Sequence, residues 1–433
     1  MARAVEISRG GGQGGSTTSP RAAIRKLAFS RGVTYAGGNA AFWALSVTLY
    51  EQTQSVTVVA VAALASFSVP AAISPLAGSL GDRFDRRRVM IVSELAGALC
   101  FLGLAVAVDW PAALLALRVL ASIAWSPLEP ATNAALPCLV SDEQFEDANA
   151  AISKAGIAGC LIGSAAAAVV LPTFGASVVF LVNSATFLFS AAVISSIRGD
   201  FRPRVEERNE VSAGFSFLRQ HPVLRPVTLA FAATFFGIGL TIPVEIVIAT
   251  EFGAGSLGYA MMFTFWGIGG LLGASAGNRL KYRPRKVKLM AAACLTVAGG
   301  FLAVSAAPVF AIVIFGMALG GVGEGLWEIT QNSLIQRVTP DGIRSRVFAA
   351  STAAMQATIA LGLLASGAVT AAFGASGAFA VAGAAALGAT LILVLGGALA
   401  ARRQSGRAPA AAQAAAKRRR RPRAPAQPVE APR

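Results

Sequence analysis

Four ionisable side chains lie in apolar stretches of the sequence, where a charge requires a physical reason. Arg118 and Glu245 each lie inside such a stretch, and Glu324 and Glu328 are four residues apart, so a helix presents both on one face. A charge at the centre of a bilayer costs at least about 2.5 kcal/mol, and two neighbouring carboxylates favour reversible protonation. We therefore expect proton coupling or substrate contact from these four residues, with solvated helix ends or structural ion pairs as the alternative.

The composition identifies the environment of these charges as a lipid bilayer. Hydrophobic residues make up 55% of the 433 residues and charged residues 13%, about half the share that is usual in soluble domains. Backbone groups in lipid must be satisfied within the segment, and no alternating ten-residue pattern of a barrel is present. The sequence predicts an all-α membrane protein.

Apolar stretches near the roughly 20 residues that span a hydrocarbon core recur along the chain. The expected transmembrane helices are twelve in number and cover approximately 29–49, 56–78, 88–108, 112–134, 150–171, 176–197, 226–249, 255–277, 288–306, 308–330, 347–372 and 376–400. With these spans, 36 of the 37 Lys and Arg residues fall on one side of the membrane, and Arg118 is the exception. Because basic loops stay in the cytoplasm, we expect both termini there.

The chain divides into two halves that repeat each other. At a constant offset of 199 residues, Gly78 matches Gly277, Glu129 matches Glu328, and FGAS at 174–177 recurs at 373–376. Two parallel six-helix repeats predict a binding site between them, near the bilayer midplane. The expected parts are a disordered N-terminal tail at 1–26 without a cleavable signal peptide, a six-helix bundle at 27–197, a central loop at 198–225, a second bundle at 226–400 and a disordered basic tail at 401–433.

Several other chemistries find no residues to support them. The four cysteines are widely spaced, His221 is the single histidine, and no phosphate-binding loop occurs, so we expect no metal, no cofactor and no enzymatic activity. We expect His221 to be exposed in the central loop. The tail carries ten Lys or Arg and one Glu. After a membrane domain, such a tail favours anionic lipid or solvent as its partner, and not nucleic acid.

The loop after the second span resembles a motif of the major facilitator superfamily. GSLGDRFDRRRVM, from Gly78 to Met90, matches the pattern G-x-L-x-D-R-x-G-R-[RK], with Asp85 in place of a glycine. The stretch from Pro130 to Ala150 is similar to the drug- and siderophore-exporting branch that includes macrolide and enterobactin exporters. The resemblance covers about residues 25–400. It implies a cytoplasmic gate that latches the two halves, for which we expect Gly78, Asp82, Arg83, Arg86, Arg87 and Glu129.

Two further motifs of the superfamily are weaker, so proton antiport is implied by the resemblance alone. The fourth span keeps only Arg118 of an R-x-x-Q-G motif, and the fifth loses the proline of G-P-x-x-G-G. Arg118 should meet an acid or helix carbonyls, while Glu94 should form a structural pair, for instance with the arginine loop. Four tryptophans could line a hydrophobic cavity or pack against core and lipid: Trp43, Trp125, Trp266 and Trp327.

Together these features predict a secondary transporter in the bacterial inner membrane. We expect export of an amphiphilic small molecule (an antibiotic, drug or siderophore) by alternating access, coupled to proton influx. The direction of transport follows from the resemblance. A lysophospholipid-type flippase and a non-transporting receptor that acts through its basic tail stay open as alternatives.

Overall fold

The computed structural model describes residues 19–140, 142–198, 211–280, 286–340 and 343–419, leaving out some side chains, including those of 74–83 and 397–419. The part of the chain that is described is helical apart from short connections. The first half comprises α1 (Pro20–Thr53), α2 (Val56–Arg83), α3 (Arg86–Val106), α4 (Pro111–Trp125), α5 (Leu128–Leu139) and α6 (Asp142–Ser195). The second half comprises α8 (Leu224–Thr241), α9 (Glu245–Glu251), α10 (Gly255–Leu280), α11 (Lys286–Ser305), α12 (Phe310–Val338) and α13 (Arg344–Arg419), with α7 (Val211–Gln220) between the halves.

The helices account for every span expected from the sequence, although some are joined and others divided. Within the described residues, eight helical segments are long and apolar enough to cross a membrane. Two of these are about twice the required length, and α6 and α13 each bend at a glycine in the left-handed region, Gly175 (φ 78°) and Gly374 (φ 73°). These glycines are 199 residues apart, so both repeats make the same turn, and only glycine adopts this φ without strain.

Two spans are each built from a pair of shorter helices. The fourth span consists of α4 and α5, separated at Ser126 and Pro127, and the seventh consists of α8 and α9, separated around Pro243. Proline supplies no backbone N–H and ends the preceding helix. The all-α membrane fold with two six-helix halves is therefore confirmed, and the helices are consistent with the expected twelve spans.

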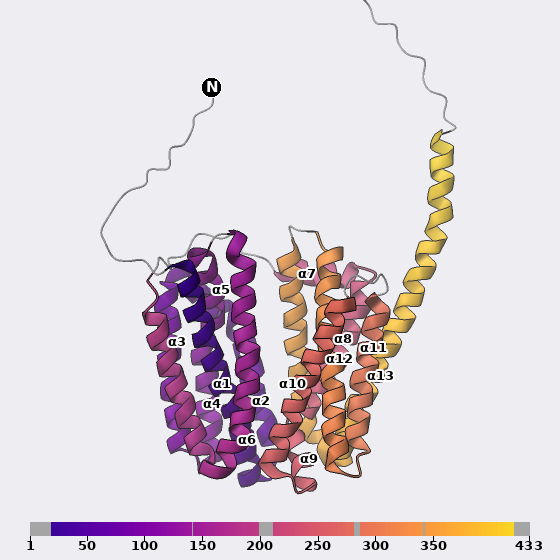
Figure 1. Ribbon diagram of the computed structural model, residues 1–433. Coiled ribbons are helices and arrows are strands. Elements are labelled where there is room, and N and C mark those ends of the chain that lie inside the picture. The colour runs from indigo at the N-terminus through magenta and orange to yellow at the C-terminus, as the bar shows by residue number, and fades with distance from the viewer. Residues whose placement is uncertain (1–18, 141, 199–210, 281–285, 341–342, 420–433) are drawn as a thin grey trace, which may run out of the picture.

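The two halves stand side by side and touch more closely at one end than at the other (Figure 1). We call the end where α1 begins, α7 lies and α13 leaves the bundle the basic end, and the end that carries α9 the opposite end. Between the halves, α2 packs against α13 and α6 against α10. Toward the opposite end, the Trp43 ring of the first half contacts the rings of Tyr259 and Phe263 in the second, with centroids 4.7 and 4.4 Å apart.

The repeat extends to individual contacts inside each half. At an offset of 200 residues, α1 matches α8 and α3 matches α11. The Thr34 hydroxyl lies 3.4 Å from Glu94, and the Thr234 hydroxyl lies 3.5 Å from Cys294. Met90 and Met290 are both fully buried. The two halves therefore share one packing plan, and the residues in which they differ are informative about function.

The basic end also bears the described parts of the two tails. α1 begins at Pro20, inside the segment for which we expected disorder, and residues 1–18 lie outside the described part of the chain. The backbone of α13 is helical beyond residue 400 as far as Arg419 and extends away from the bundle (Figure 1). This segment is rich in alanine, which has the highest helix propensity.

Candidate functional site

Two adjoining cavities lie between the halves, with volumes of about 1050 Å³ and 470 Å³. Both halves supply their walls, and Tyr35, Glu129, Cys160, Phe263 and Glu324 line both cavities. The larger cavity reaches toward the opposite end, and the smaller one lies on the side of the basic end. A space of this size is typical of small-molecule sites.

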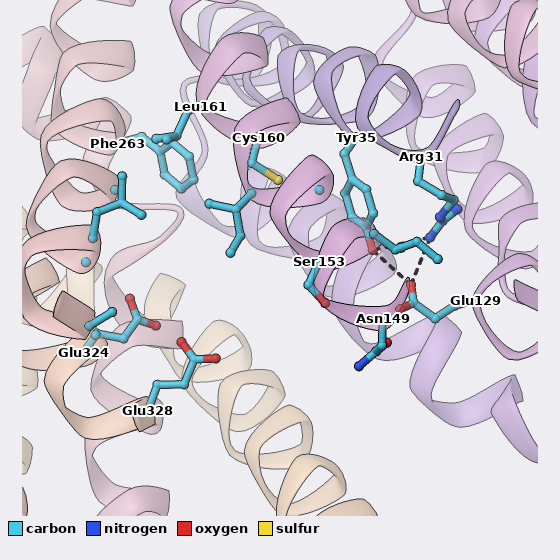
Figure 2. Close-up of a pocket in the computed structure, with 18 of the residues that line it drawn as sticks. Arg31, Tyr35, Glu129, Asn149, Ser153, Cys160, Leu161, Phe263, Glu324 and Glu328 are labelled. Atoms are coloured by element: carbon cyan, nitrogen blue, oxygen red, sulfur yellow. Dashed lines mark hydrogen bonds and ion pairs between the residues drawn. The ribbon is translucent and has the colours of Figure 1, made fainter. Parts of the chain in front are cut away.

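The wall from the first half carries a compact charged cluster. The Arg31 Nη2 atom lies 3.2 Å from the Glu129 Oε2 atom, and the Tyr35 hydroxyl donates to the same oxygen at 3.0 Å (Figure 2). The guanidinium of Arg31 also lies over the rings of Tyr35 and Trp125, 4.9 and 5.5 Å from their centroids. The positive charge of Arg31 therefore offsets the negative charge of Glu129, and α1 and α5 are held together.

The wall from the second half carries two carboxylates one helical turn apart. Glu324 and Glu328 lie on the same face of α12, and Figure 2 places both across the cavity from Arg31 and Glu129. The indole N–H of Trp266 on α10 donates to Glu324 Oε2 at 2.5 Å. Among the described residues, no Lys or Arg nitrogen lies within 4.0 Å of either carboxylate. The sequence prediction that the two would share a face holds in the structure.

Close packing of α10 against α12 brings Trp266 and Glu324 together. A Cβ atom on Gly325 would overlap the carbonyl oxygen of Gly270, and one on Gly321 would overlap the carbonyl oxygen of Trp266. Small residues at such a contact let two helices approach in a membrane. The glycines on both helices therefore fix the position of the Glu324 side chain.

The larger cavity contains two further ionisable groups. The Arg118 Nε atom donates to the Ser66 hydroxyl at 2.9 Å, so its partner among the described residues is neither the acid nor the carbonyl group expected from the sequence. Glu245, in the first turn of α9, is 6% exposed and lines the cavity. From its position near the end of a span, the sequence analysis allowed a solvated side chain as the alternative. The structure thus brings Arg118, Glu245 and Glu324 to one cavity.

Three of the four candidate tryptophans line the cavities and one does not. Trp43, Trp125 and Trp266 border the larger cavity, beside Phe42, Phe67, Phe101, Phe187, Phe235 and Phe263. Trp327 is 3% exposed, stacks on Phe231 with centroids 5.7 Å apart and donates to Gln331. It belongs to the core of the second half and lines neither of the two cavities.

The described residues of the expected gate make contacts inside the first half. Arg86 donates to the carbonyl oxygen of Ala134 at 2.6 Å, and Arg87 donates to the carbonyl oxygen of Ser195. Ser195 is the last residue of α6, so the second contact satisfies a carbonyl group at a helix end. Glu129 pairs with Arg31 of its own half. The side chains of Asp82 and Arg83 and the surroundings of Gly78 lie outside what the structure describes, so the gate stays a prediction.

The sequence analysis did not single out Arg31 or Tyr35, and for two other residues its expectations differ from the structure. Glu94 is fully buried and accepts from Ser190 at 2.6 Å and Thr34 at 3.4 Å, so its described partners are hydroxyls and not the arginine loop. His221 was expected to be exposed, but its Nδ1 atom accepts from the backbone N–H groups of Val223 and Leu224 at 3.3 Å each. Arg31 lies inside the expected first span at 29–49, and a charge at that position is the signal that could have singled it out.

Two six-helix halves around a central cavity define a membrane transporter, and comparisons with known proteins specify the family. The profile of the Major Facilitator Superfamily matches residues 27–274 and 227–429, and the chain belongs to this family. Its members are transporters and not enzymes, as the sequence led us to expect.

Relatives of known sequence include exporters. The chain is 26% identical over 356 residues to the uncharacterized MFS-type transporter YfiS of Bacillus subtilis, covering 78% of this chain and 84% of the relative. It is 25% identical to the putative bacilysin exporter BacE of Bacillus amyloliquefaciens (68% and 76% covered). It is 28% identical to the multi-drug resistance efflux pump PmrA of Streptococcus pneumoniae (68% and 75% covered).

Solved structures share the fold at low sequence identity. A bacterial homolog of the human lysosomal transporter Spinster, in an inward-facing and occupied conformation, superimposes with a TM-score of 0.70 at 13% identity, covering 90% of this chain and 98% of that one. The nucleoside transporter NupG gives a TM-score of 0.69 at 11% identity, covering 86% and 98%. These similarities show the fold alone.

Proposed function

We propose that the protein exports an amphiphilic small molecule from the cell by alternating access, driven by the inward flow of protons. The observation that carries this proposal is the cavity of about 1050 Å³ between the halves, lined by apolar and aromatic side chains with a few ionisable groups. Apolar walls with a small number of polar groups suit an amphiphilic ligand.

Alternating access is supported by the unequal contacts at the two ends of the molecule. Aromatic rings of both halves pack together toward the opposite end, while Glu129 and Glu328 at the basic end line a cavity and are exposed. Since the halves repeat each other, rocking of one against the other exchanges the open and closed ends. The relatives described as exporters favour export as the direction.

Coupling to protons is proposed from the carboxylates in this cavity. Glu245, Glu324 and Glu328 line the cavities, and a carboxylate that alternately faces two aqueous sides can carry a proton across. We place the protein in the inner membrane of a bacterium with the basic end in the cytoplasm, because Lys and Arg gather at that end. The basic tail would contact anionic lipid there.

The test is accumulation of a panel of lipophilic drugs and siderophores in bacterial cells that lack their own exporters. Cells that express the protein should accumulate less of at least one compound, and a protonophore should abolish the difference. Glu324→Gln should lose export at an unchanged protein level. Glu251→Gln, an exposed carboxylate near the opposite end, is the matched control and should export normally.

If no compound in a broad panel changes its accumulation, the export proposal is wrong. Protonophore-insensitive export would retain the transporter but exclude coupling to protons. In that case, a spin-labelled lysophospholipid should be tested in reconstituted vesicles, because a flippase shares the architecture and needs no proton movement.

A further inference from the structure

The two halves of the cavity differ in how they neutralise their carboxylates. Glu129 and Glu328 are matched by the repeat and both line the smaller cavity. In the first half, Arg31 and Tyr35 contact Glu129. At the offset of 200 that relates α1 to α8, the positions of Arg31 and Tyr35 are taken by phenylalanines. The second half has therefore kept the acid and lost the cation.

Those phenylalanines are core residues that offer Glu328 no charge. Phe231 and Phe235 are 5% and 7% exposed, and their rings pack on each other with centroids 4.4 Å apart. Phe231 also stacks on Trp327. Glu324 takes the place of Trp125 at the offset of 199, so the second half carries an additional acid where the first half has an aromatic ring.

From this asymmetry we propose that Glu324 and Glu328 bind the cationic group of the exported molecule, a protonated or quaternary amine, so that the substrate is an amphiphilic cation. This inference rests on the proposed export function and names the class of its substrate. A cation is the ligand that satisfies two carboxylates for which the described protein provides no ion-pair partner.

A balance of the charges that line the cavities leads to the same pair. The ionisable Arg and Glu side chains among the lining residues are two arginines and four glutamates: Arg31, Arg118, Glu129, Glu245, Glu324 and Glu328. Arg31 is paired with Glu129. Arg118 and Glu245 share the larger cavity and oppose each other in sign. Among the described lining residues, Glu324 and Glu328 remain without a balancing positive charge.

The aromatic rings around the two carboxylates suit the same ligand. Trp266 donates its N–H to Glu324 Oε2, which fixes the carboxylate beside the ring. Tyr35, Trp125 and Phe263 complete the wall around this region. A cation near the face of an aromatic ring is stabilised by about 0.5–1 kcal/mol at exposed sites, and the same rings hold the apolar part of the ligand. An anionic substrate would instead meet two uncompensated negative charges.

The test compares two ions of the same shape and opposite charge, tetraphenylphosphonium and tetraphenylborate. Their binding to the purified protein in detergent is measured by equilibrium dialysis, which needs no transport. The wild type should bind the phosphonium at least about tenfold more tightly than the borate. Glu328→Gln should weaken phosphonium binding about tenfold, the value of one charge-assisted contact.

Two further variants keep the result interpretable. Glu328 is exposed in the cavity, so Glu328→Lys should still fold and should reverse the preference toward the borate. Glu251→Gln removes an exposed carboxylate outside the cavity and should bind like the wild type. The thermal midpoint of each variant confirms that the protein is folded.

The proposal is overturned if the wild type binds neither ion, if it binds both equally, or if the Glu328 variants match the Glu251 control. The binding test of the cation site is independent of the cell-based test of export. Charge-selective binding without export in cells would sustain the cation site and refute export. Proton-driven export of a compound together with equal binding of the two ions would sustain export and refute the cation site.

Discussion

The partners in the ion pair between Arg31 and Glu129 have very different environments. The Arg31 side chain is 2% exposed and the Glu129 side chain is 55% exposed. A carboxylate left alone at that exposure is hydrated, whereas a buried guanidinium without its partner is an uncompensated charge. The two residues should therefore respond unequally to mutation, although they belong to the same contact.

We predict that Glu129→Gln destabilises the protein more than Arg31→Gln, because only the former leaves a buried charge unpaired. The expected coupling energy of the double-mutant cycle is about 1 kcal/mol, since solvent screens the exposed partner. Thermal unfolding of the three variants in one detergent measures it. Equal effects of the single mutations, or strict additivity in the double variant, would show that the pair does not contribute in this way.

Residues of the site could be predicted from the sequence only where their chemistry alone set them apart. Glu324 and Glu328 were identified because charge in an apolar stretch is costly, and both line a cavity. The contact of Arg31 with Glu129 joins residues 98 positions apart, and only the packing of α1 against α5 creates it. The position of Trp327 could not be predicted either. Helical periodicity gives the direction of each side chain around α12 but does not say which direction faces the cavity and which faces the core.

At the scale of elements, the contact between α10 and α12 depends on the absence of side chains. We predict that Gly325→Ala displaces α12 from α10, lowers stability by about 1–3 kcal/mol and impairs export, because its Cβ atom would overlap the carbonyl oxygen of Gly270. Thermal unfolding and the accumulation assay measure these effects.

Gly388→Ala is the control for this prediction. Gly388 is also helical, but a Cβ atom there would have no neighbour within 4 Å. Alanine has a higher helix propensity than glycine, so this variant should be as stable as the wild type or more stable. If both substitutions have the same effect, close approach of α10 and α12 is not the cause.

The start of α8 provides a pH-dependent contact outside the membrane-spanning segments. Burial lowers the pKa of His221 below its usual range, and its Nδ1 atom can accept from Val223 and Leu224 only while that nitrogen is unprotonated. Below a pH of about 6.5 the unfolded chain gains a proton that the folded protein resists. The contribution of His221 is thus fully present at higher pH and decreases as the pH falls through this range.

We predict that the thermal midpoint of the wild type falls more steeply between pH 7 and pH 5 than that of His221→Asn. Asparagine provides a side-chain acceptor at the start of a helix and does not titrate. The two midpoints should have a constant difference at and above pH 8. Parallel curves throughout the acidic range would mean that His221 does not stabilise α8 in the way its contacts suggest.

The helices themselves were largely predictable, whereas their bends and joins were less so. Apolar length located the spans, since a helix is the way to satisfy a backbone in lipid. The sequence did not indicate that α6 would pass from one span to the next through Gly175, or that the Ser126–Pro127 step would divide the fourth span. These features depend on one or two residues, to which an average over a window of hydropathy is insensitive.

At the scale of the whole molecule, the contact toward the opposite end sets which side of the cavity is closed. Trp43 of α1 is 3% exposed and packs edge-to-face on Tyr259 of α10. It also contacts Phe263, which lies on α10 as well. Aromatic pairs of this kind contribute about 0.5–1.5 kcal/mol each beyond the area they bury. Both contacts cross from one half to the other, so they stabilise the conformation that is closed at the opposite end.

We predict that Trp43→Ala moves the conformational equilibrium about tenfold toward the state open at the opposite end, since loss of these contacts amounts to roughly 1.4 kcal/mol or more. Double electron–electron resonance between spin labels at Asp109 and Glu251 should then report longer distances across that end. Labels at Lys154 and Arg279, toward the basic end, should report shorter ones. All four positions are exposed, and the labels require a background without the native cysteines.

Distances that lengthen at both ends would indicate separation of the halves, and unchanged distances would mean that other contacts hold the opposite end closed. Only opposite changes at the two ends agree with rocking of the halves around the cavity.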